Sequence, residues 1–189
     1  MSLYCALLAR LAGLDAQRAE LIRIASPMHD VGKIGIPDRI LLKPGRLSED
    51  ERRVMEAHTE MGHRILAGSD VELLDLAAEM ALTHHERIDG TGYPRALGGD
   101  AIPVEGRICA IADVFDALTS DRVYRQAFQP DEARELMLQG RSTQFDADLL
   151  DLFVASFDDV LAIRRAAGTG TSEQTLAIAL AHASGHRAT

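Results

Sequence analysis

The segment from about Val104 to Thr119 constrains the fold more than any other part of the chain. Its central sequence, RICAIADVFDAL, is apolar on almost every side of a helix, so other elements have to surround it. Asp113 and Asp116 are its acidic exceptions, and buried carboxylates are rare unless they have a partner. The segment therefore predicts a central helix whose two carboxylates need an explanation.

The composition favours further helices around this segment. Aromatic residues make up 4% of the 189 residues and Trp is absent, whereas Ala, Leu, Glu and Arg are abundant. With 47% hydrophobic residues, a chain of this length can bury one complete core. We expect an all-α helical bundle in one domain, residues 1–160, followed by a tail, residues 161–189, that is a weak helix or disordered.

The charge and the apolar runs exclude several classes of partner. A net charge of −9 argues against nucleic acid, so any phosphate ligand must be held by local cations or metal ions. Cys5 and Cys109 lie in apolar stretches without CxxC spacing, which indicates buried thiols in a reducing compartment. No apolar run reaches membrane-spanning length and no secretory signal is present. We therefore expect a cytoplasmic protein without a membrane partner.

Two polar pairs stand where predicted helices end. A helix from about Ala16 to Met28 runs into HDVGKIGIP, where glycine and proline break the helical pattern, so His29 and Asp30 lie at a helix end. A later helix ends near THHE and is followed by the glycine-rich loop RIDGTGYPRALGGDAIP. The second pair, His84 and His85, is therefore expected at the mouth of that loop.

A capping box marks the start of another predicted helix. Ser48 and Glu51 have the required spacing, and the helix that they open carries His58 near its middle. The charged run EDERR at its start is interpreted as a solvated helix face.

Six side chains have the chemistry of metal ligands and stand at helix ends or on apolar helices: His29, Asp30, His58, His84, His85 and Asp113. Neighbouring residues on a helix point about 100° apart, so an HD or HH pair brackets two ions better than it chelates one. Imidazoles with carboxylates and no thiolate suit Fe, Mn or Zn. These residues predict a two-metal site, which is well suited to phosphoester hydrolysis.

Three strings of the sequence are similar to the successive signatures of the HD-GYP group of HD-domain phosphohydrolases. They are HDVGKIGIPDRILLKPGRLS, HHERIDGTGYPRALGGDAIP and ADVFDALTSDRVYR, and the match spans about Tyr4 to Phe128. The resemblance implies an HD helical bundle with a GYP loop. It also implies hydrolysis of cyclic di-GMP to linear pGpG, with GMP as an open further product, at a centre of two or three metals.

The resemblance also assigns roles to individual residues. Asp30 would bridge two metals, with the other five side chains as further ligands. Lys33 would lie beside the cluster and neutralise charge on the phosphate or the leaving oxygen. Asp116 would orient Lys33 or the attacking hydroxide, and Arg122 and Arg125 would contact the ligand phosphates.

The loop that contains Gly92, Tyr93 and Pro94 would take part in binding. Tyr93 would bond to the nucleotide or stack on it, and Gly92 gives the backbone unusual freedom. The resemblance associates this loop with GGDEF-domain partners and the whole domain with an N-terminal receiver or sensory region. Dimerisation is left open.

The first helix departs from the family pattern. Family members carry a further metal-binding His, and often a Glu, before the position of Tyr4, but residues 1–13 contain neither. Either the chain begins after that ligand or the site is impaired, and two metals are favoured over three.

Simpler roles and rival functions remain open. Asp116 can pair with an arginine, Lys33 can cap a helix, Tyr93 can anchor the loop, and the two arginines can be surface cations. The rival enzyme is an HD phosphohydrolase for another nucleotide, such as a cyclic GMP-AMP hybrid or a guanosine polyphosphate. The rival from another class is a catalytically silent module that senses nucleotide or docks a cyclase.

Overall fold

The structure is a computed structural model that describes residues 1–121 and 126–169. Across these residues it has helices and isolated β-bridges but no strands, so the predicted all-α class is confirmed. The α-helices are α1 (Ser2–Leu11), α2 (Ala16–Ala25), α3 (Asp38–Leu41), α4 (Glu49–Glu56), α5 (His58–Leu66), α6 (Glu72–Thr83), α7 (Val104–Leu118), α8 (Pro130–Leu138), α9 (Ala147–Ala155) and α10 (Phe157–Thr169). Short 3-10 turns are η1 (Ser26–Met28), η2 (Val31–Gly35) and η3 (Gly99–Ala101).

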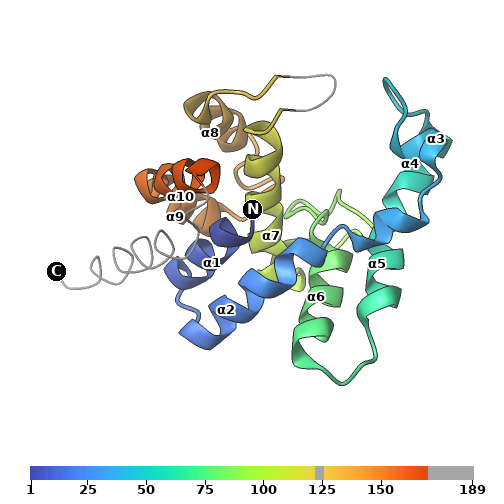
Figure 1. The fold of residues 1–189 in the computed structure, drawn as a ribbon, viewed down its shortest axis with the longest axis horizontal. Helices are drawn as coiled ribbons and strands as arrows, with labels where there is room; N and C mark the ends of the chain where they lie inside the picture. The colour runs from blue at the N-terminus through green and yellow to red at the C-terminus, as the bar shows by residue number, and fades with distance from the viewer. Residues whose placement is uncertain (122–125, 170–189) are drawn as a thin grey trace.

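Helix α7 runs through the middle of the molecule (Figure 1) and contacts α1, α6, α8 and α9. Ile108, Cys109, Ile111 and Phe115 along it are fully buried. The predicted central helix is therefore confirmed.

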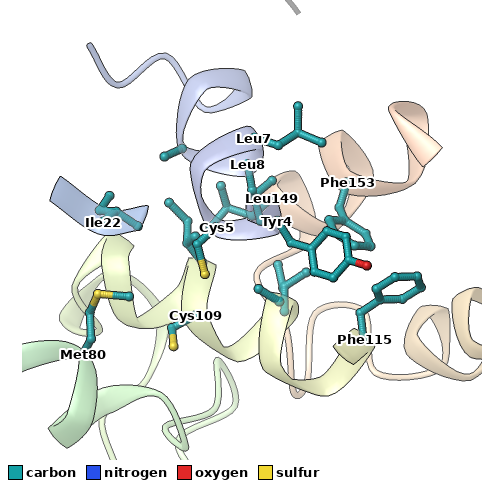
Figure 2. Close-up of a cluster of buried hydrophobic side chains, with 14 of the residues drawn as sticks. Tyr4, Cys5, Leu7, Leu8, Ile22, Met80, Cys109, Phe115, Leu149 and Phe153 are labelled. Atoms are coloured by element: carbon teal, nitrogen blue, oxygen red, sulfur yellow. The ribbon is translucent and has the colours of Figure 1, made fainter. Parts of the chain in front are cut away.

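Aromatic rings join α7 to its neighbours on one face. Phe115 meets Tyr4 of α1 and Phe153 of α9 edge to face, each with ring centroids 5.3 Å apart. Figure 2 shows these rings together with Leu7, Leu8 and the separate sulfurs of Cys5 and Cys109. Both thiols are buried and free, as the sequence predicted.

The last helix crosses the predicted domain boundary. Residue 160 falls inside α10, and Val160 and Ile163 are both buried in the same core. The core therefore includes part of the segment that was assigned to the tail. Residues 170–189 lie outside the described part of the chain, so the character of the tail stays a prediction.

One predicted helix is interrupted. The capping box at Ser48 and Glu51 is present as predicted, but the helix ends at Glu56 and a new one begins at His58. The His58 ring bonds to the Met55 carbonyl and the Thr59 hydroxyl to the Glu56 carbonyl, and such local bonds compete with the helical ladder. His58 is therefore the first residue of α5, not a mid-helix residue as predicted.

Helices α3 and α4 lie to one side of the bundle, next to α5 (Figure 1). Because α4 leads directly into His58, it borders the candidate site described below. None of the described helices is long and apolar enough to cross a membrane.

Candidate metal centre

Asp30 lies at the centre of the predicted ligand cluster. Its Oδ1 atom is 3.4 Å from Nε2 of His58 and 3.8 Å from Nε2 of His84. Its Oδ2 atom is 3.4 Å from Nε2 of His29. The two oxygens of one carboxylate thus face different histidines, as a bridging ligand requires.

The cluster has two parts that meet at Asp30. Asp30, His58, His84 and His85 each offer a ligand atom, and these atoms all lie within 4.8 Å of one another. His29 lies on the Oδ2 side, and its Nε2 atom is 3.5 Å from Oδ1 of Asp113. The structure therefore brings the six predicted ligands together from η1, η2, α5, α6 and α7 or their ends.

Backbone carbonyls orient three of the imidazole rings. Nδ1 of His29 is 2.7 Å from the Ser26 carbonyl oxygen, and Nδ1 of His58 is 2.7 Å from that of Met55. Nδ1 of His84 is 3.0 Å from the Ala81 carbonyl oxygen. A carbonyl oxygen only accepts, so each Nδ1 donates, and the Nε2 atom of each ring is the one that faces the cluster.

The centre of the cluster is rich in acceptors and poor in donors. Nε2 of His58 is 3.4 Å from Nε2 of His84, and both face Oδ1 of Asp30. Within the described residues, Nε2 of His29 and Oδ1 of Asp30 are buried without a hydrogen-bond partner. Lone pairs gathered this way repel one another unless a cation lies among them. These residues fit a metal ion, and imidazole with carboxylate is a common donor set for transition metals.

Burial and charge separate the pKa values of the histidines. Burial, helped by the nearby charge of His58, lowers the pKa of His85 to about 3. Burial also lowers the pKa of His58 and, together with His85, that of His84. Burial alone would lower the pKa of His29, but the nearby carboxylates of Asp113 and Asp30 raise it to about 10.

The acids of the cluster stay ionised despite their partial burial. Burial would raise the pKa of Asp30, but His29 and Lys33 together hold it well below the usual range. The pKa of Asp113 is lowered in the same way by His29, again against the effect of burial. Both carboxylates are therefore available as anionic ligands near neutral pH.

Gly32 explains how η2 comes so close to α5. A Cβ atom at this position would lie 1.9 Å from the His58 carbonyl oxygen and 2.4 Å from the backbone nitrogen of Gly62. Only glycine permits this approach, which places Asp30 against His58. The sequence showed Gly32 merely as a helix breaker, because the close contact involves residues distant in the chain.

The glycine-rich loop is tied to the histidine pair by Glu86, which the sequence analysis did not single out. Its buried carboxylate accepts the backbone N–H groups of Arg95 at 2.8 Å and Leu97 at 2.9 Å. The available signal was its position directly after the histidine pair, where the apolar helix ends and a carboxylate needs hydrogen-bond donors.

Tyr93 and Gly92 of the glycine-rich loop also pack on the histidine pair. The Tyr93 ring stacks on His85 with centroids 4.8 Å apart. A Cβ on Gly92 would lie 2.6 Å from the His85 carbonyl oxygen, so Gly92 is needed for backbone packing. The loop thus covers one edge of the cluster.

The structure agrees with the expected position of Lys33 but not with every role expected of the other predicted residues. Nζ of Lys33 is 2.5 Å from Oδ2 of Asp30, so Lys33 lies beside the cluster as expected. Asp116 accepts a hydrogen bond from the amino group of Met1 at 2.9 Å, and Lys33 pairs with Asp30 instead. Of the two roles expected for Asp116, a contact with Lys33 is not observed, and orientation of the attacking hydroxide stays a prediction. Arg122 and Arg125 lie outside the described residues, and their role stays a prediction.

A pocket of about 270 Å³ opens beside His84 and His85. Tyr93 and Gly92 of the loop line it, together with Arg52 and Glu56 of α4. Neither α4 residue was expected at the site, because Arg52 belongs to the charged run EDERR, which is typical of a solvated helix face, and Glu56 lies just after it.

Comparison with known proteins gives consistent results. A family model described as "HD domain" matches residues 1–149. The chain is 46% identical over 164 residues to the 3′3′-cGAMP-specific phosphodiesterase 2 of Vibrio cholerae, covering 87% of this chain and 31% of that protein. It is 47% identical over 151 residues to a cyclic di-GMP phosphodiesterase response regulator of Xanthomonas campestris pv. campestris, covering 80% and 40%.

Another relative and a solved structure extend this picture. The chain is 55% identical over 112 residues to a cyclic di-GMP phosphodiesterase of Thermotoga maritima, covering 59% of this chain and 30% of that protein. These relatives are thus much longer than this chain. A crystal structure of a cyclic GMP-AMP specific phosphodiesterase from V. cholerae aligns with a TM-score of 0.55 at 17% identity, covering 83% and 43% of the two chains. That likeness shows a shared fold.

Proposed function

Because the chain belongs to the HD domain family and within it to the HD-GYP group, we propose that it is a metal-dependent phosphodiesterase that hydrolyses cyclic di-GMP to linear pGpG. The observation that carries the proposal is the cluster itself, in which ligand atoms of Asp30, His58, His84 and His85 lie within 4.8 Å of one another. Hydrolysis would add water across one phosphodiester bond: its oxygen bonds to phosphorus, the P–O3′ bond breaks, and a proton goes to the leaving 3′ oxygen.

The six clustered side chains would hold two divalent cations. Asp30 has one oxygen towards each part of the cluster and would be shared between them. The nitrogen and oxygen donors favour Fe or Mn, with Zn as a further candidate. When bound, such ions lower the pKa of water and neutralise the charge of phosphate oxygens.

The surrounding residues would bind and orient the substrate. The Lys33 ammonium group beside Asp30 can stabilise negative charge on the phosphate. Tyr93 borders the neighbouring pocket and can contact a base there. Arg122 and Arg125 would neutralise the second phosphate, which a chain with a net charge of −9 needs local cations to hold.

A panel of nucleotides tests the reaction. The protein is stripped of metal, loaded with Mn²⁺ or Fe²⁺, and incubated with cyclic di-GMP, 3′3′-cGAMP and linear nucleotides. We expect cyclic di-GMP to be cleaved to pGpG, and the product profile decides whether GMP follows. Activity on linear substrates alone would remove the proposal.

A matched pair of variants tests the site. His58→Gln removes a cluster ligand, whereas His63→Gln changes a histidine of the same helix outside the cluster. We expect the first to lower activity at least about tenfold, as loss of even an outer partner of a metal ligand does, and the second to retain activity. Equal activities of the two variants would contradict the assignment.

A second candidate substrate follows from the comparisons. Because the relative from V. cholerae that matches 87% of this chain is named as 3′3′-cGAMP-specific, the same panel compares that nucleotide with cyclic di-GMP. Guanosine polyphosphates are the remaining enzyme alternative and belong in the panel.

The non-enzymatic alternative is a module that senses nucleotide or docks a GGDEF-domain partner. Metal analysis separates it from the enzyme, because we expect two ions per chain for the enzyme. Fewer than two ions, with nucleotide bound and uncleaved, would favour the sensor. An upstream receiver or sensory region and a dimer also stay predictions.

A further inference from the structure

We propose that Glu56 and Arg52 form a guanine-selective subsite in the pocket beside the cluster, an inference that rests on the proposed function. Both residues line the pocket of about 270 Å³ that also borders His85 and Tyr93. A base held there would lie next to the metal ligands, where the phosphodiester bond is cleaved.

The two side chains are placed to act together. They stand four residues apart on α4, a spacing that puts both on one face of the helix. An acidic and a basic residue at this spacing often pair, yet no ion pair or side-chain hydrogen bond of either residue occurs within residues 1–121 and 126–169. Both groups therefore keep their hydrogen-bonding capacity for a ligand.

The neighbouring residue provides an internal contrast. Arg53 on the same helix pairs with Asp50 and is absent from the lining of the pocket. Ion pairs therefore do form along α4 where they face solvent. Arg52, which lines the pocket, has no such pair among the residues that the structure describes.

The size of the pocket suits one base. Complete small-molecule sites are usually about 300–1,000 Å³, so about 270 Å³ would hold part of a cyclic dinucleotide, not all of it. The second base and the ribose-phosphate ring would then extend over the cluster towards Lys33.

Guanine matches the chemistry of this pair better than adenine does. A carboxylate accepts two hydrogen bonds from the N1–H and 2-amino groups of guanine, and a guanidinium donates to its O6 and N7 atoms. Adenine has a lone pair at N1 and an amino group at C6, so it would set an acceptor against Glu56 and a donor against Arg52. The pair therefore favours guanine on both edges.

The test combines two variants with a trimmed substrate. Cyclic di-IMP differs from cyclic di-GMP by loss of the 2-amino group, which is one of the two donors that Glu56 would bind. For the wild-type protein we expect KM for cyclic di-IMP to be at least about fivefold higher, since a good bidentate base contact gives about 1–3 kcal/mol of discrimination. Glu56→Gln should bring the two KM values together while kcat changes little, because the contact acts on binding.

Arg52→Gln probes the contact with the O6 and N7 atoms of guanine. It should raise KM for both of these nucleotides by a similar factor, because O6 and N7 are present in both bases. Glu60→Gln and Arg53→Gln are the matched controls, since these residues lie near the pair in sequence but do not line the pocket. Both controls should keep the preference of the wild-type protein.

A binding measurement separates this inference from the proposed function. Calorimetric titration of the metal-free protein with the same nucleotides reports selectivity without turnover. Binding that prefers cyclic di-GMP and loses this preference in Glu56→Gln, with no hydrolysis under any metal, would support the subsite and overturn the proposed function. Hydrolysis with a guanine preference unchanged in Glu56→Gln and Arg52→Gln would overturn the subsite and leave the function standing. Absence of binding and of hydrolysis would overturn both.

Discussion

Helix α7 contributes to two buried regions, one made of aromatic rings and the other of polar side chains. Phe115 and Asp113 are two residues apart, so they point about 200° apart around the helix. Phe115 enters a core in which Tyr4, Phe153 and Phe157 surround its ring. Asp113 enters a cluster where buried acceptors face one another. Packing explains the first region, whereas the second region gathers polar side chains that could hold a metal ion.

The largest expected effect lies in the aromatic core. Phe115→Ala removes a fully buried ring and should lower the free energy of unfolding by about 3–5 kcal/mol. Urea unfolding followed by circular dichroism measures the loss. Leu136→Ala, which changes a side chain that is 39% exposed, serves as the control and should stay within about 0.5 kcal/mol of wild type. A loss below about 1 kcal/mol for Phe115→Ala would mean that the core repacks readily.

In the metal cluster we expect a substitution to affect activity much more than stability. Asp30→Asn keeps the size of the side chain but removes the shared anionic ligand, so we expect activity to fall at least about 100-fold, or about 2.7 kcal/mol in transition-state stabilisation. The free energy of unfolding of the metal-free protein should fall by only about 1 kcal/mol, because the ion pair that Asp30 loses with Lys33 is partly exposed to solvent. Steady-state kinetics and urea unfolding on the same preparation give both numbers. A variant that unfolds as easily as Phe115→Ala while staying active would reverse the comparison between the two regions.

Gly32 connects packing with ligand placement. Gly32→Ala would force η2 away from α5, with an expected loss of about 1–3 kcal/mol in unfolding free energy and weaker metal binding. Gly35→Ala is the matched control in the same turn, since its Cβ would meet only the flexible Met61 side chain, at 2.6 Å from its sulfur. Metal titration of both variants checks the difference. Equal metal affinity in Gly32→Ala and wild type would show that the close approach is not required for the site.

The smallest effect is expected at the edge of the bundle. Ser48→Ala removes the side chain that caps α4 and should cost about 1 kcal/mol of stability. Thermal unfolding measures it. Because α4 leads into His58, the change also shows whether fraying of this helix reaches the cluster. Unchanged activity in a variant with a lower Tm would confine the effect to α4.

The sequence predicted the parts of the fold that have a local cause. The apolar pattern of α7 and the capping box at Ser48 each involve residues a few positions apart, and both are present. The break between α4 and α5 was missed because it depends on side chains that bond to nearby carbonyls. A weak helix beyond residue 160 was among the expectations, but the burial of Ile163 in the core was not, because it depends on distant partners.

The clustering of the six residues could be predicted because their residue types are unusual on apolar helices. How the rings are oriented could not, since backbone carbonyls of Ser26, Met55 and Ala81 carry no signature in the sequence. The partner of Asp116 and the closeness of Arg52 and Glu56 to the loop depend on tertiary placement in the same way.

The carbonyl bonds to His29, His58 and His84 have a consequence for how quickly a site of this kind can form. Turning any of these rings over would exchange its two nitrogens and break a hydrogen bond at 2.7–3.0 Å, so each ring is held in a single orientation before it meets an ion. The entropy of ordering these rings is therefore lost during folding and not during capture of the ion. An arriving cation has to shed its water shell, but it does not have to wait for the protein to rearrange.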